Sequence, residues 1–125
     1  MQREESHAGP GRLNLELPPD VDAPAAARRA LRSLPLGERE LDVLLLASEL
    51  VTTAVVHAGA VPSVPIELSA TCEAGRTRVE ILDHGAPQFA AELSGGYGLR
   101  VLAGASERWG IEHDGFTRVW FEVGQ

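Results

Sequence analysis

Three polar side chains recur at every fourth position in an otherwise apolar stretch of the chain. Glu49, Thr53 and His57 fall within the segment ELVTTAVVHA, residues 49–58. Residues four apart stack on one side of an α-helix, so a helix here gathers a carboxylate, a hydroxyl and an imidazole on one stripe. Three stacked polar groups on an otherwise apolar helix need an explanation, and a functional role is one. A helix face that simply meets solvent is the alternative that the segment alone leaves open.

An apolar run that ends in Asp-x-Gly is the second candidate. The segment VEILDHG, residues 79–85, ends in Asp83, His84 and Gly85. A turn in which the aspartate bonds to the nearby backbone is a common structure for such a motif. The motif gains weight only in combination with the other two segments.

Glycines open the third candidate, GGYGLRVL, at residues 95–102. If a helix begins here, its first backbone N–H groups and its dipole can hold phosphate oxygens. The segment is not a Rossmann fingerprint, because no strand leads into it as that motif requires. A flexible loop followed by an ordinary helix start is the alternative.

The hydrophobic pattern predicts the elements that must position these segments. Strands are predicted over residues 12–17, 64–72, 77–82, 107–113 and 116–123, and helices over about 22–34, 38–58 and 97–106. Asp20 or Asp22 is expected to cap the first helix. On the long helix, the residues expected to face inward are Leu41, Leu44, Leu45, Ser48, Val51 and Val55. The order of elements predicts an α/β fold, a two-layer sandwich with a mixed, mostly antiparallel sheet and helices on one face.

Length and composition narrow the class of protein. The 125 residues suit one domain, expected over residues 12–125 after a flexible N-terminal tail at residues 1–11. The net charge of −7 argues against nucleic-acid binding and suits a basic protein partner. Cys72 is the only cysteine, so no internal disulfide can form. No apolar run approaches the ~20 residues of a membrane span, and a cytoplasmic location is expected.

The three segments, in this order and at this spacing, resemble the N box, G1 box and G2 box of the GHKL superfamily, the histidine kinase-like ATPases of the Bergerat fold. The most similar branch is that of the anti-sigma-factor serine/threonine kinases. In that branch the helix motif reads approximately ELVTNAVxHA, and this chain has ELVTTAVVHA. The segments RWG, residues 108–110, and VWF, residues 119–121, also resemble that branch, and the resemblance covers residues 13–123.

This resemblance implies ATP and Mg²⁺ as cofactors and assigns roles to residues. It implies Glu49 as the catalytic residue, which acts as a base or orients a water, and Thr53 as the position of the Mg²⁺ ligand. It implies that Asp83 accepts a hydrogen bond from the adenine amino group. The other residues implied to bind the nucleotide are His57, Gly85, Gly96, Gly98 and Leu99.

Two departures from the family pattern bear on activity. Thr53 stands where the family has Asn, and its hydroxyl reaches one atom less far than an amide oxygen. Residues 86–97 carry no basic side chain that could stabilise a transferring phosphate, so phosphoryl transfer is expected to be weak or lost. The resemblance implies an ATP-binding regulator that binds a sigma factor or a STAS-type anti-anti-sigma partner. Other members of that branch dimerise, so a homodimer is possible. The alternative is a non-catalytic protein-binding module of the same fold.

Overall fold

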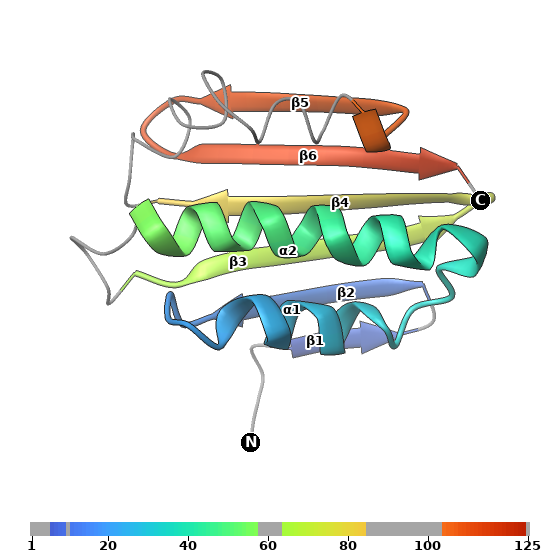
Figure 1. The fold of residues 1–125 in the computed structure, drawn as a ribbon, viewed down its shortest axis with the longest axis horizontal. Helices are drawn as coiled ribbons and strands as arrows, with labels where there is room; N and C mark the ends of the chain where they lie inside the picture. The colour runs from blue at the N-terminus through green and yellow to red at the C-terminus, as the bar shows by residue number, and fades with distance from the viewer. Residues whose placement is uncertain (1–5, 10, 58–63, 85–103, 125) are drawn as a thin grey trace.

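The computed structural model describes residues 6–9, 11–57, 64–84 and 104–124, and within them six strands and three helices form two layers (Figure 1). The strands are β1 (Ser6–Gly9), β2 (Arg12–Leu17), β3 (Ile66–Glu73), β4 (Arg76–Asp83), β5 (Arg108–His113) and β6 (Thr117–Gly124). The helices are α1 (Ala23–Leu31), the short 3₁₀ helix η1 (Gly37–Arg39) and α2 (Glu40–His57).

The strands form a single sheet in the order β1-β2-β3-β4-β6-β5, and every pairing among the described residues is antiparallel. Both α-helices lie on the same face of the sheet, α1 over its β1–β2 side and α2 over its middle (Figure 1). The predicted two-layer α/β sandwich is therefore confirmed. The predicted strands and the long helix lie within two residues of their expected ends.

Alternation along the strands separates a buried face from a polar one. In β4, Thr77, Val79, Ile81 and Asp83 are buried, and the residues between them are partly exposed. β6 repeats this pattern beside it, and the two helices close the core from above. Burial of the apolar side chains is the main favourable term for such a layered fold.

Helix α2 is oriented differently from the prediction. Leu41 and Leu45 were expected to face inward, but they are 63% and 61% exposed. The buried side chains are instead Val43, Leu44, Leu46, Ala47, Leu50, Val51 and Ala54. Apolar residues occur on more than one side of this helix, so the helical period alone does not fix which side faces the sheet.

Helix α1 begins at the predicted capping region and is tied to α2. Asp22 occupies the N-cap position without a side-chain cap, whereas the carboxylate of Asp20 accepts a hydrogen bond of 2.9 Å from the backbone N–H of Asp22. Farther along, the Arg28 guanidinium donates a hydrogen bond of 2.7 Å to the hydroxyl of Ser48 on α2. This bond places Ser48 on the side of α2 that faces α1.

The N-terminal segment is not a tail throughout. Residues 6–9 of the expected tail form β1, which pairs with β2 from Ser6↔Leu15 to Gly9↔Arg12. Gly11 makes this connection possible, since its φ is +78° and a Cβ there would lie 2.6 Å from the carbonyl oxygen of Cys72. No pattern in the sequence predicted β1, because its pairing is made by backbone groups and the segment SHAG has no apolar alternation.

The helix predicted over residues 97–106 falls mostly outside the described residues. Gly104 and Ala105 are described, and both are helical. The chain then enters the β5–β6 hairpin, whose turn contains Gly115 with a φ of +75°. A positive φ is accessible to glycine at little cost, as the predicted turn at Asp114 and Gly115 requires.

Candidate nucleotide-binding site

Asp83 is the last residue of β4 and is almost completely buried, at 1% exposure. It lies between Ile66 of β3 and Thr117 of β6 in the register of the sheet, on the face that the helices cover. Burying a carboxylate costs free energy unless polar groups surround it. The placement of Asp83 at a strand end, predicted from the sequence, is confirmed, and its burial marks this end of the core as polar.

Thr117 belongs to the same polar region and was missed by the sequence analysis. It is directly opposite Asp83 across the β4–β6 pair, and it is also 1% exposed. On its other side, its hydroxyl lies 3.2 Å from Nδ1 of His113 on β5. Only the register of two strand pairs brings these residues together, so spacing along the chain held no signal for them.

The stripe predicted on the long helix lies on the flank of α2 that is turned away from α1. Successive residues of an α-helix are about 100° apart, so Glu49 and Thr53 lie well round the helix from Ser48, which bonds to α1. Both side chains are half-buried, unlike the exposed Thr52. Both residues thus lie on the flank of α2 that is turned away from α1, and a fully solvated helix face does not describe them. In Figure 1, β6 and β5 lie on the side of α2 away from α1.

Thr53 uses its hydroxyl hydrogen within the helix. Its Oγ1 donates a hydrogen bond of 3.0 Å to the carbonyl oxygen of Glu49 one turn earlier. The oxygen keeps a lone pair that can accept a hydrogen bond or bind a hard cation. Among the described residues no group of three His, Cys, Asp or Glu side chains could hold a metal. A Mg²⁺ ion held through one hydroxyl, nucleotide phosphates and waters fits such a donor set.

Asp83, at the end of β4, lies at the same end of the molecule as the C-terminal end of α2 (Figure 1). The C-terminal end of β4 and the C-terminal end of α2 lie at the same end of the two layers (Figure 1), and the two elements are in contact. His57 is the last residue of α2, and the placement of its side chain lies outside the description. The other predicted site residues, Gly85, Gly96, Gly98 and Leu99, also lie outside the described residues.

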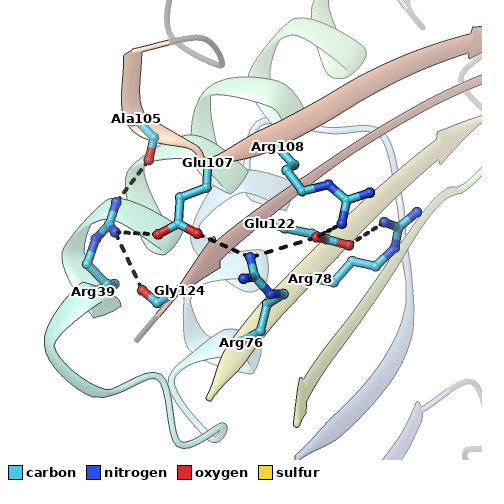
Figure 2. A network of polar contacts seen from close by, with 8 residues as sticks. All are labelled: Arg39, Arg76, Arg78, Ala105, Glu107, Arg108, Glu122 and Gly124. Atoms are coloured by element: carbon cyan, nitrogen blue, oxygen red, sulfur yellow. Dashed lines mark hydrogen bonds and ion pairs between the residues drawn. The ribbon is translucent and has the colours of Figure 1, made fainter. Parts of the chain in front are cut away.

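The opposite face of the sheet carries a network of arginine and glutamate side chains. Glu122 is buried on this face and lies 2.8 Å from Arg78 and 3.3 Å from Arg108, with Arg76 at 3.9 Å (Figure 2). Arg76 also bonds Glu107, which joins the network to Arg39 (Figure 2). Partial burial lowers the pKa of Arg78, but its hydrogen bonds to Glu122 and Glu80 outweigh this and raise the pKa above its ordinary value.

The indole of Trp120 packs within this same face. It lies against Gly110 of β5, where an added Cβ would come within 2.5 Å of its Nε1, and the Arg78 guanidinium stacks 4.2 Å from its ring centroid. Arg78 stacks on this indole and is paired with Glu122 and Glu80, so these side chains contribute to the packing of the sheet face. The described residues that the sequence predicts to bind a nucleotide lie elsewhere, on the helix-covered side of the sheet.

Comparisons of the sequence with known proteins and protein families show which family the chain belongs to. Among the described residues, none of the helices has the length and apolar character needed to cross a membrane. A comparison with curated proteins gave no match. A family model described as the histidine kinase-like ATPase domain matches residues 17–122 and so spans all three predicted motifs. The predicted superfamily is thereby confirmed, and the chain belongs to the histidine kinase-like ATPase domain family.

Proposed function

We propose that this protein is an ATP-binding regulator that resembles the anti-sigma-factor serine/threonine kinases. The observation that carries the proposal is the buried carboxylate of Asp83 at the end of β4, at the same end of the two layers as the C-terminal end of α2 (Figure 1). A carboxylate in that position suits the amino group of adenine, which offers two N–H donors. Family membership supports ATP binding in general, and the role in regulation is our extension of it.

In this proposal each polar group has one task. Asp83 accepts a hydrogen bond from the base, Thr53 offers its hydroxyl lone pair to Mg²⁺, and Glu49 orients a water or accepts a proton. Gly85, Gly96, Gly98, Leu99 and His57 complete the nucleotide-binding set by resemblance. Bound ATP would supply the phosphoryl group for any transfer.

Regulation would proceed through a protein partner. We propose a sigma factor or a STAS-type anti-anti-sigma protein, with ATP changing the affinity for it, and a cytoplasmic location goes with that partner. We expect phosphoryl transfer to be slow, because Thr53 replaces Asn and no basic residue occurs in residues 86–97. A homodimer is part of the same proposal.

A second function, a binding module that does not use ATP, is favoured by a different observation. Leu41, Leu45 and Val56 are more than 60% exposed and follow one stripe of α2. Exposed apolar stripes of this kind suit an amphipathic segment of a partner. Glu38 and Glu40 are exposed at the start of the same helix region, so the partner segment would carry basic side chains beside its apolar ones.

Calorimetric titration with ATP and Mg²⁺ tests the choice. We expect the wild type to bind and Asp83→Asn to bind at least tenfold more weakly, since the amide places a donor where the base also has one. Thr53→Asn is expected to bind more tightly than the wild type, and only when Mg²⁺ is present. Glu67→Gln, an exposed change on the opposite face of the sheet, is the control and should leave the affinity unchanged.

The outcomes separate the two functions. Equal affinity in the wild type and Asp83→Asn would refute the role of Asp83. Absence of binding in the wild type, with binding gained in Thr53→Asn, would favour the module that does not use ATP. Thermal shifts give an independent reading, because a ligand at 100 times its Kd stabilises the native state by about 2.7 kcal/mol.

A further inference from the structure

We propose that His113 is a positioning residue that sets the direction of the Thr117 hydroxyl and thereby makes adenine-nucleotide binding dependent on pH. This inference rests on the proposed function, because it concerns the same nucleotide site. It adds two residues, His113 and Thr117, that none of the three sequence motifs contains.

A polar row across three strands is the geometric basis. His113 of β5 pairs with Thr117 of β6, and Thr117 pairs with Asp83 of β4, so the three side chains project from neighbouring positions on one face. Nδ1 of His113 lies 3.2 Å from Oγ1 of Thr117. Thr117 and Asp83 are buried, whereas His113 is exposed and can exchange protons with water. The row therefore runs from solvent to the buried carboxylate.

The protonation state of His113 determines whether the Thr117 hydroxyl presents a hydrogen-bond acceptor or a donor next to Asp83. When the ring is neutral with its hydrogen on Nε2, Nδ1 accepts the hydrogen of the Thr117 hydroxyl. The hydroxyl oxygen then presents lone pairs beside the Asp83 carboxylate. Two neighbouring acceptors suit an amino group with two N–H donors, as in adenine, and not the carbonyl oxygen that guanine carries at that position.

Protonation of His113 reverses this arrangement. Nδ1–H of the charged ring donates to Oγ1 of Thr117, so the hydroxyl hydrogen turns to another acceptor, and Asp83 is next in the row. The Asp83 carboxylate then accepts a hydrogen bond from Thr117, which competes with the amino group of the base, and Thr117 no longer offers that group an acceptor. Histidine side chains change charge between about pH 5 and 8, so the effect falls in an accessible range.

In the part of the chain that the structure describes, the other charged groups at this end of the sheet lie on the opposite face or in the turn. Asp114 is exposed in the turn next to His113. The opposite face carries two pairs, Glu112–Arg118 at 2.9 Å and His84–Glu67 at 3.0 Å. His84 is thus a matched control for His113: it lies at the same end of the sheet and is also exposed, but it contacts Glu67 and not the polar row.

The experiment is calorimetric titration with ADP and Mg²⁺ at pH 7.5 and pH 5.5. The variants are His113→Phe, Thr117→Val and the control His84→Phe. In the wild type, the affinity should fall at pH 5.5 about five- to tenfold more than in His113→Phe, which corresponds to roughly one hydrogen bond. Thr117→Val should also lose this extra pH dependence, and His84→Phe should keep it. Titration of the ligand phosphates affects all variants alike, so it cancels in the comparison.

A second readout uses the base. The wild type should prefer ADP to GDP at pH 7.5, and that preference should narrow in Thr117→Val. Thermal melting of each variant first establishes that it is folded, and His113→Gln, a smaller change at an exposed position, replaces the phenylalanine variant if that one is not folded. An equal pH dependence in the wild type and the His113 variant would overturn this inference alone. A wild type that binds neither nucleotide at either pH would overturn the proposed function, and this inference with it.

Discussion

Replacing Glu122 by Gln tests the charge network on the open face of the sheet. The Glu122 side chain is only 10% exposed and lies within 4 Å of Arg76, Arg78 and Arg108 (Figure 2). Removing one charge from a fully buried pair typically costs about 3–5 kcal/mol. Here the three arginines keep 34% to 66% of their side-chain surface in water, so we expect a loss of roughly 2 kcal/mol.

Thermal unfolding followed by circular dichroism measures this loss. With an unfolding entropy of roughly 2.1 cal/mol/K per residue and 125 residues, a loss of 2 kcal/mol lowers the Tm by about 8 °C. The matched control is Glu112→Gln, which removes a more exposed ion pair between Glu112 of β5 and Arg118 of β6. That pair should contribute less than about 1 kcal/mol, or less than about 4 °C.

A double-mutant cycle measures how much of the lost stability comes from the contact between Glu122 and Arg78. Arg78→Gln and Glu122→Gln are measured singly and together, and we expect a coupling of about 1 kcal/mol because their 2.8 Å contact is the shortest in the cluster around Glu122. If Glu122→Gln lowers the Tm no more than Glu112→Gln does, the argument from burial is wrong. A coupling near zero would instead assign the loss to Arg108 and Arg76.

Two further predictions concern packing. Gly110→Ala places a methyl group 2.5 Å from Nε1 of Trp120 and should lower the free energy of unfolding in urea by about 1–3 kcal/mol. The control Gly104→Ala, whose methyl group meets no atom within 4 Å, should leave this free energy almost unchanged. Equal effects of the two changes would refute the close approach of the indole. On α2, Leu46→Ala should lower the free energy of unfolding by about 2–5 kcal/mol, whereas Leu45→Ala should change it by no more than about 0.5 kcal/mol. The reason is that the two side chains are 0% and 61% exposed. A larger loss at Leu45 than at Leu46 would contradict the observed orientation of the helix.

Local patterns in the sequence determined the elements and the family. Alternation identified β2, because a strand buried on one face repeats its apolar residues with period two, and apolar runs bounded by turn residues identified β3, β4, β5 and β6. The three motifs identified the superfamily, since their order and spacing follow the chain itself. The same patterns placed Asp83 at a strand end and Glu49 and Thr53 on one stripe of a helix.

The tertiary structure decided everything that depends on which elements are neighbours. The prediction for α2 was wrong at Leu41 and Leu45 because a helix with apolar residues on more than one side takes its orientation from the sheet and from α1. β1 depends on backbone pairing that leaves no mark on side-chain types. The row of Asp83, Thr117 and His113 exists only through the registers of the β4–β6 and β5–β6 pairs. Contacts between residues distant in the chain are set by packing and hydrogen bonding across strands, and these are invisible to periodicity along any single strand.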